Sequence, residues 1–146
     1  MSTPTPTPGV RTYTGSCHCG AVRYEADLDL SAGTGRCNCT WCTKMGWWGC
    51  MASPGAFRLL SGADNLTKFG KTPTADRAVC STCGVAAFGH GDVPEIGGEY
   101  YSVNVRCLEG VDLDGVPVHY LDGLHDTWAL LRQAPYVDPF RERASG

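Results

Sequence analysis

The sequence lacks three features that would assign it to a familiar class of protein. No stretch approaches about 18 consecutive apolar residues, so no membrane-spanning helix is predicted. The amino terminus, MSTPTPTPGV, has neither the charged segment nor the apolar segment of a secretory signal, so we expect a cytoplasmic protein. The 12 Lys and Arg residues are scattered singly, and the formal net charge is −3. Without a basic stripe, nucleic acid is a poor candidate for a partner.

Signals for long helices are also scarce. The 146 residues include 19 Gly and 9 Pro, a composition that favours many turns and short strands. Hydrophobic residues make up 42% and charged residues 18%, as in a globular protein, and the length suits one domain of about 100–150 residues. We therefore predict a mainly β, single-domain protein at residues 10–135, with a disordered Pro/Thr-rich tail at 1–9 and a C-terminal tail at 136–146.

Alternation of apolar and polar residues predicts where the main strands lie. AVRYEADLDL, residues 21–30, alternates strictly, which is the period-2 pattern of a half-buried strand. YYSVNVRC, residues 100–107, alternates in the same way and places Cys107 on the core side. Shorter strand candidates are 57–60, 66–69, 77–79 and 85–88.

The last third of the sequence carries a helix signal. Leu124, Trp128 and Leu131 recur at helical spacing, so we expect a short amphipathic helix that ends before Pro135. The histidines of this half have no spacing typical of metal ligands, and we interpret them as surface or hydrogen-bonded residues: His90, His119 and His125.

The nine cysteines are the strongest chemical signal in the sequence. Cytosolic thiols are normally kept reduced, so clustered cysteines there are more often metal ligands or catalytic groups than disulfide partners. Short spacings bring sulfurs within roughly 4 Å of each other, as tetrahedral zinc with bonds of about 2.3 Å requires. Cys50 and Cys107 stand alone. The other seven form Cys17-x-Cys19, Cys37-x-Cys39-x-x-Cys42 and Cys80-x-x-Cys83.

Two of these groups make one complete four-thiolate site. We predict that a structural zinc binds Cys17, Cys19, Cys80 and Cys83 and connects an early hairpin to a late one. The alternative is a set of four buried free thiols. His18 lies between the first two ligands and would point to the other side of a strand, so we interpret it as a spectator or as a hydrogen-bond donor to the ligands.

The middle group has three thiolates, Cys37, Cys39 and Cys42, and no obvious fourth ligand. Three protein ligands with one open position distinguish a catalytic zinc from a closed structural one. Cys50, or a histidine from elsewhere, could fill the vacancy, and the site would then be structural too. If the position is open, it can accept a thiol and lower the pKa of that thiol. We therefore predict a working metal at this group.

Cationic and aromatic side chains flank the middle group. Arg36 and Lys44 are placed to offset the thiolate charge or to pair with a substrate carboxylate, or else they are solvated surface charges. Trp41, Trp47 and Trp48 either line a pocket for a thiol adduct or pack in the core.

Five segments, taken together, make the chain resemble a known family. They are GSCHCGAVRYE at 15–25, RCNCTWC at 36–42, FRLLSGADNLTKF at 57–69, CSTCG at 80–84 and YYSVNVRCLEGVD at 100–112. In this order and spacing they resemble the glutathione-dependent formaldehyde-activating enzyme family, which also includes centromere protein V.

The resemblance implies a fold, two metal sites and a reaction. The fold is a β-tent of antiparallel sheets stapled by zinc, with one ion at the four-cysteine group and a second at Cys37, Cys39 and Cys42. The implied activity is that of a carbon–sulfur lyase, which condenses glutathione with formaldehyde to S-hydroxymethylglutathione. The resemblance also implies that the second zinc site can be labile or empty. A small thiol such as glutathione is the expected partner.

The chain departs from the best-known form of the family beside the second site. That form has His and Ser-Asp where this sequence has Asn38 and Thr40-Trp41, so the residues that decide what binds there differ. The main alternative is a non-catalytic, zinc-stabilised binding or scaffolding module. A zinc-ribbon nucleic-acid binder is a third reading, disfavoured by the acidic balance. The sequence carries no indication of the oligomeric state.

Overall fold

The computed structural model describes residues 9–70 and 75–142, and these form eleven strands and one short α-helix. The helix, α1, spans Thr40–Met45. The strands are β1 (Arg11–Ser16), β2 (Arg23–Leu28), β3 (Thr34–Cys37), β4 (Gly49–Ala52), β5 (Phe57–Ser61), β6 (Leu66–Phe69), β7 (Ala75–Cys80), β8 (Ala86–Val93), β9 (Gly98–Asn104), β10 (Pro117–Leu121) and β11 (Leu130–Pro135). The prediction of a mainly β protein is confirmed.

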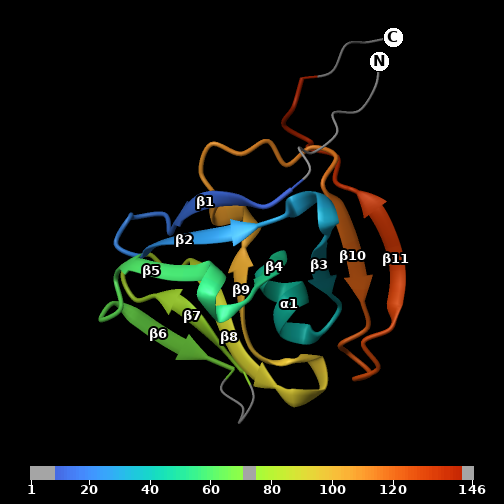
Figure 1. The fold of residues 1–146 in the computed structure, drawn as a ribbon, viewed down its shortest axis with the longest axis horizontal. Coiled ribbons are helices and arrows are strands. Elements are labelled where there is room, and N and C mark those ends of the chain that lie inside the picture. Colours follow the sequence, from blue (N-terminus) through green and yellow to red (C-terminus); the bar gives the residue numbers. More distant parts are fainter. Residues whose placement is uncertain (1–8, 71–74, 143–146) are drawn as a thin grey trace.

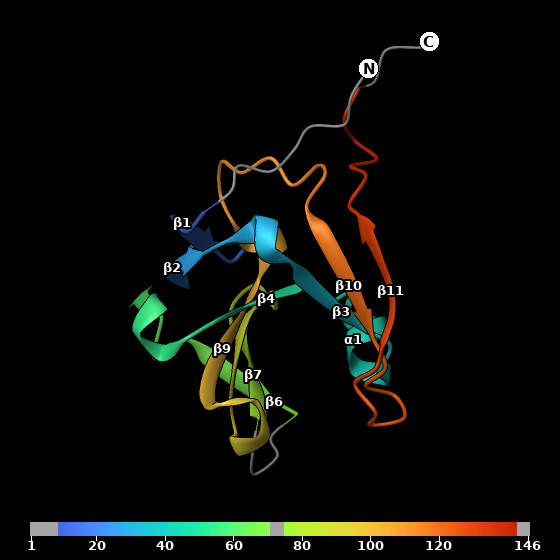
Figure 2. The same cartoon turned by 45° about the vertical axis from the view of Figure 1, so that its right-hand side comes forward.

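The strands form two sheets (Figures 1 and 2). The smaller sheet has the order β1-β2-β5, and the larger has the order β11-β10-β3-β4-β9-β8-β7-β6. The alternating segment at 21–30 becomes β2, whose residues are alternately buried and half-buried, as the period-2 pattern requires. All strand pairs are antiparallel except β3 with β10, which run parallel. Parallel pairing brings the carboxyl ends of these two strands to the same edge of the sheet.

An aromatic core joins the two sheets. Tyr24 of β2 and Phe57 of β5 face Phe88 of β8 and Tyr101 of β9 across the interface. The Phe57 and Tyr101 rings stack with centroids 4.2 Å apart and planes at 10°, while Tyr24 meets Phe88 edge-on at 6.2 Å. Contacts of this kind contribute about 0.5–1.5 kcal/mol each beyond area burial. The core therefore lies between the sheets and leaves both cysteine groups near strand ends.

The predicted helix at 124–131 is wrong. This segment is a loop followed by β11, which pairs with β10 at the edge of the large sheet. Asp126 and Trp128 adopt φ angles of 58° and 55°, which no α-helix contains. Leu124, Trp128 and Leu131 are all more than half exposed, so their spacing marks no buried stripe. Pairing with β10 gives the backbone N–H and C=O groups of 130–135 more hydrogen-bond partners than an isolated helical turn could.

Other predictions from the pattern hold in part. The shorter strand candidates correspond to β5, β6, β7 and β8. The alternating segment at 100–107 is β9 only as far as Asn104, and then becomes a short 3-10 helix over Val105–Cys107. Cys107 is nevertheless buried.

Most of the proposed 1–9 tail, and residues 143–146 of the C-terminal tail, lie outside the described residues. Within the described part of the chain, no helix is long and apolar enough to cross a membrane.

Candidate metal centres

The four-cysteine group gathers at the meeting point of two hairpins. Cys17 and Cys19 follow β1, while Cys80 ends β7 and Cys83 lies in the turn before β8. All four sulfurs lie within 4.8 Å of one another. The Sγ atoms of Cys17 and Cys19 are 3.7 Å apart, and those of Cys19 and Cys80 are 3.6 Å apart. Tetrahedral zinc with bonds of about 2.3 Å separates its sulfurs by about 3.8 Å, so these residues fit a zinc ion.

Backbone amides turn toward the sulfurs of this cluster. The Val22 N–H donates to Cys17 Sγ over 3.3 Å, and the Cys83 N–H donates to Cys80 Sγ over 3.5 Å. Desolvation raises the pKa of Cys83, but hydrogen bonds from the backbone of Val85 and Cys19 outweigh it and lower that pKa to about 6. Such donors favour the thiolate form, which is the form that binds a metal.

The three-cysteine cluster is built within one short stretch of chain. Cys37 ends β3, Cys39 caps the amino end of α1, and Cys42 lies on α1 itself. Their sulfurs also lie within 4.8 Å of one another. The Cys39 N–H donates to Cys37 Sγ over 3.3 Å, and the Cys42 N–H donates to Cys39 Sγ over 3.4 Å. Among the residues that the structure describes, no other Cys, His, Asp or Glu joins this group.

The thiols of this cluster differ in their surroundings. Burial, together with the neighbouring thiols of Cys39 and Cys37, raises the pKa of Cys42 to about 12. Burial also opposes ionisation of Cys39, but the backbone amide and thiol of Cys42, the Cys37 thiol and nearby Arg77 together lower the pKa of Cys39. The donor set consists of three soft, partly buried sulfurs, one of which, Cys39, has a lowered pKa, and it fits zinc.

Arg77 is a cation that sequence reasoning did not connect with this cluster. It comes from β7, and its guanidinium lies 4.5 Å from the centroid of the Trp41 ring. Trp41 in turn packs on Trp47, with ring centroids 5.9 Å apart. Arg77 stands 35 positions after Cys42 in the chain, so no local motif connects the two. Only the pairing of distant strands brings this charge near the sulfurs.

A loop between β10 and β11 lies over the cluster and was also missed. Asn38, between the first two ligands, donates from Nδ2 to Asp122 Oδ1 over 3.0 Å, and its Oδ1 accepts from the Leu124 N–H over 2.9 Å. Gly123 lies so close to Cys37 Sγ and to the Trp128 ring that a Cβ at this position would clash with both. The loop therefore fixes the position of the Cys-x-Cys turn.

Asp122 is the centre of this loop. Its side chain is only 11% exposed and accepts hydrogen bonds from His125 Nδ1 at 2.9 Å and from Thr127 Oγ1 at 2.9 Å. Hydrogen bonds from Asn38, then from His125 and Thr127, lower the pKa of Asp122 to about 2. A sequence signal was available in the polar run LDGLHDT, but it was interpreted as part of a helix.

The remaining candidate residues lie elsewhere. Cys50 is buried in the core, where its thiol points to the Gly33 carbonyl over 3.8 Å and burial raises its pKa to about 11, so it does not supply the fourth ligand. Trp48 is buried, as the core alternative predicted. Arg36 lines a pocket beside Trp48, and Lys44 is exposed on α1. His18 is exposed.

The fold and the two sulfur clusters define a mainly β protein able to hold two metal ions. The model of the family named "glutathione-dependent formaldehyde-activating enzyme" matches residues 12–117. A crystal structure of a Rhodobacter sphaeroides protein is 37% identical in sequence, with a TM-score of 0.60, and the match covers 68% of this chain and 90% of that chain. The chain belongs to the glutathione-dependent formaldehyde-activating enzyme family. Membership supports a lyase-type role, and both clusters are able to bind zinc.

Proposed function

We propose that the protein is a zinc-dependent carbon–sulfur lyase that acts on a small thiol, with glutathione as the first candidate. In the reaction, the thiol loses its proton, its sulfur forms a bond to the aldehyde carbon, and the carbonyl oxygen takes up a proton. Nothing is oxidised or reduced. Cys37, Cys39 and Cys42 would hold the working zinc, and Cys17, Cys19, Cys80 and Cys83 would hold a structural one. Residues 10–135 would form the active domain, working in the cytoplasm.

One observation carries this proposal: both clusters consist of cysteine sulfurs, but they differ in the number of sulfurs they contain. Four sulfurs close the first cluster, whereas the second has three sulfurs and gains no further Cys, His, Asp or Glu from the described residues. A zinc ion with three protein ligands supplies an open position at which a thiol becomes a thiolate near neutral pH.

The chain's own residues would prepare that position. The amides of Cys39 and Cys42 stabilise thiolates by direct hydrogen bonds, and Arg77 adds a positive charge nearby. The Asn38–Asp122 hydrogen bond holds the ligand turn in place, so little reorganisation is needed when substrate arrives.

The decisive experiment is proton exchange NMR of glutathione with formaldehyde, with zinc-loaded protein. We expect faster exchange with the wild-type chain and a rate close to the uncatalysed one with Cys42→Ser. Cys50→Ala is the matched control, since it removes a buried thiol that lies outside both clusters. An uncatalysed rate at high concentration of the wild-type protein would discard this substrate.

A binding module is the second candidate, because one edge of the molecule is unusually apolar. The loop before β11 and the start of β11 expose four large side chains by 55–58% each: Leu124, Trp128, Leu130 and Leu131. Exposed apolar surface of this kind suits a protein partner. If both metals are structural, loss of Cys42 should unfold the chain rather than leave it folded and inactive.

A further inference from the structure

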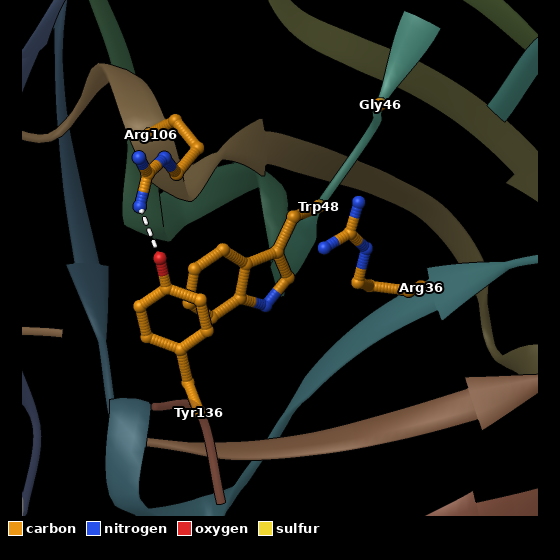
Figure 3. Close-up of a pocket in the computed structure, with 5 residues that line it drawn as sticks. All are labelled: Arg36, Gly46, Trp48, Arg106 and Tyr136. Atoms are coloured by element: carbon orange, nitrogen blue, oxygen red, sulfur yellow. Dashed lines mark hydrogen bonds between the residues drawn. The ribbon is translucent and has the colours of Figure 1, made fainter. Parts of the chain in front are cut away.

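A small pocket is lined by residues of β3, of the segment after α1 and of two later parts of the chain (Figure 3). Its volume is about 200 Å³, and its lining combines two arginines, two aromatic rings and a glycine: Arg36, Arg106, Trp48, Tyr136 and Gly46. These residues come from four separate parts of the chain, namely β3, the segment between α1 and β4, the 3-10 helix after β9, and the segment after β11. Arg36 and Trp48 were candidates for substrate contacts from their place near the cysteines, whereas Arg106 and Tyr136 join them only in the folded chain.

The aromatic side chains form a rigid wall. Trp48 is only 1% exposed, and its Nε1 donates to Thr34 Oγ1 over 2.6 Å. Core packing and this hydrogen bond together fix the orientation of the indole. The Tyr136 ring packs on it with centroids 4.5 Å apart. Because Trp48 is buried and its indole N–H is already used, it supports the Tyr136 ring from the core side and offers the pocket no free donor.

Two guanidinium groups stand at this wall. Arg106 Nη1 donates to the Tyr136 hydroxyl over 2.9 Å, which orients the arginine and leaves most of its five N–H donors free (Figure 3). Arg36 points into the pocket from β3 (Figure 3). Within residues 9–70 and 75–142, neither arginine forms an ion pair with a carboxylate. Three other arginines of the same protein do: Arg23, Arg58 and Arg141.

We propose that this pocket binds the carboxylate of a small organic acid. Guanidinium groups bind planar carboxylates through two parallel hydrogen bonds, and neither Arg36 nor Arg106 has a carboxylate partner among the described residues. The aromatic wall would pack against the carbon skeleton next to the carboxylate. The small volume favours a short chain over a bulky ligand.

The acid has two possible sources. The first is the thiol substrate itself, and this source rests on the proposed function. Arg36 directly precedes the ligand Cys37, and Gly46, the carboxyl cap of α1, follows Cys42 by four positions, roughly 6 Å along the helix axis. An extended tripeptide spans about 10 Å, so a thiol of that size could reach both. The second source is a separate acid. Arg36 and Cys37 are neighbours on β3, so their side chains point to opposite faces of the strand, and a ligand held by Arg36 need not reach the sulfurs.

The test measures binding by calorimetry, with Trp48 and Tyr136 followed by NMR. The probes are glutarate, which has no sulfur, and S-methylglutathione, which has no free thiol. We expect both to bind the wild-type protein and to bind Arg36→Gln and Arg106→Gln at least about tenfold more weakly. Arg36→Lys keeps the charge but loses the planar fork, so its binding should be intermediate. Lys44→Gln is the matched control: it removes a nearby charge that does not line the pocket.

The outcomes separate the two sources from each other and from the proposed function. A raised KM for glutathione in Arg36→Gln assigns the pocket to the thiol substrate, whereas glutarate binding with an unchanged KM assigns it to a separate acid. Carboxylate binding without any exchange activity keeps the pocket and rejects the proposed reaction. The pocket proposal itself is overturned if neither probe binds, if the arginine variants of folded protein bind them equally well, or if inorganic phosphate binds more tightly than glutarate.

Discussion

The two cysteine clusters use the same ligand type but are built in different ways. The closed cluster joins Cys19 to Cys80, which are 61 residues apart in sequence, and so connects the start of the small sheet to the large one. The open cluster is confined to residues 37–42, where β3 passes into α1. A metal in the first cluster therefore constrains the whole chain, whereas a metal in the second constrains one turn.

Because of this difference, we expect the closed cluster to affect mainly the stability of the fold and the open cluster to affect mainly the reaction. Closing a long loop costs the unfolded chain more entropy than closing a short one, so the long-range cluster should supply most of the metal-dependent stability. The short-range cluster keeps much of its shape through backbone hydrogen bonds to its own sulfurs and through the loop at Asp122. We therefore expect that this cluster loses or exchanges a ligand without unfolding of the protein. Four substitutions test this contrast, and their expected effects decrease in order.

The largest effect is expected from Cys80→Ser. Cys80 is 1% exposed and lies at the closed cluster, and structural zinc contributes on the order of 10–16 kcal/mol in small metal-folded peptides. Most domains have only about 5–15 kcal/mol of stability, so we expect a largely unfolded chain. Circular dichroism and thermal melting would show it. Cys107→Ala, a buried thiol outside both clusters, should cost only about 1 kcal/mol. Native-like melting of Cys80→Ser would refute a stabilising metal at this cluster.

The second effect is expected from Cys42→Ser, the corresponding change in the open cluster. We expect a folded protein that retains one zinc per chain instead of two. Its exchange activity should fall by more than about a hundredfold, because even residues that only support a metal ligand affect activity by about 10–100-fold. Elemental analysis and exchange NMR measure the two quantities. Unfolding as complete as that of Cys80→Ser would erase the contrast and favour the scaffold alternative.

A smaller effect is expected from Asp122→Ala, which removes the acceptor that holds Asn38. The affinity of the open cluster for zinc should fall by about 10–100-fold, while the closed cluster should be unaffected, because the loop supports only the Cys37–Cys39 turn. Chelator competition would resolve the two zinc ions by their rates of release. Asp64→Ala, in an exposed turn, serves as the control. Equal weakening of both zinc sites would show that the loop acts on the whole fold.

The smallest effect is expected at the small sheet, away from both clusters. Hydrogen bonds from Arg58 and then from Thr12 lower the pKa of Asp27 from its ordinary value of 3.8 to about 2. A carboxyl group with a lowered pKa stabilises the fold above about pH 4, and this contribution is lost as the pH falls toward 2. Arg58→Gln should return the Asp27 pKa toward 3.8, as followed by carboxyl NMR.

Because this ion pair is exposed, its loss should change stability little at neutral pH. Metal content and exchange activity of Arg58→Gln should equal those of the wild type. A marked loss of zinc in this variant would mean that the clusters depend on surface contacts of the small sheet.

Much of this molecule follows from local sequence patterns. The alternation in 21–30 predicts β2, because a half-buried strand needs that period whatever it packs against. The Cys-x-Cys and Cys-x-x-Cys spacings indicate sulfur clusters, because residues so close in sequence need only a turn to bring their side chains together. The family follows from the order of five such segments, and the match over residues 12–117 confirms it.

The errors and omissions concern contacts between distant residues. Leu124, Trp128 and Leu131 have helical spacing, yet the segment is a loop and a strand because the edge of β10 offers it a partner. Neither Arg77 nor Asp122 belongs to a motif, and each reaches the open cluster only through the pairing of strands.

The family, the mainly β fold and the short-spaced cysteines could be inferred from the amino acids alone, because these depend on composition and on geometry within a few residues. Three features appear only in the folded molecule: Cys50 stays in the core, the loop at Asp122 supports the open cluster, and Arg36 and Arg106 line one pocket. The physical reason is that these contacts join residues remote in the chain. Their geometry depends on how all the strands pair and pack. A local sequence pattern carries no information about that packing.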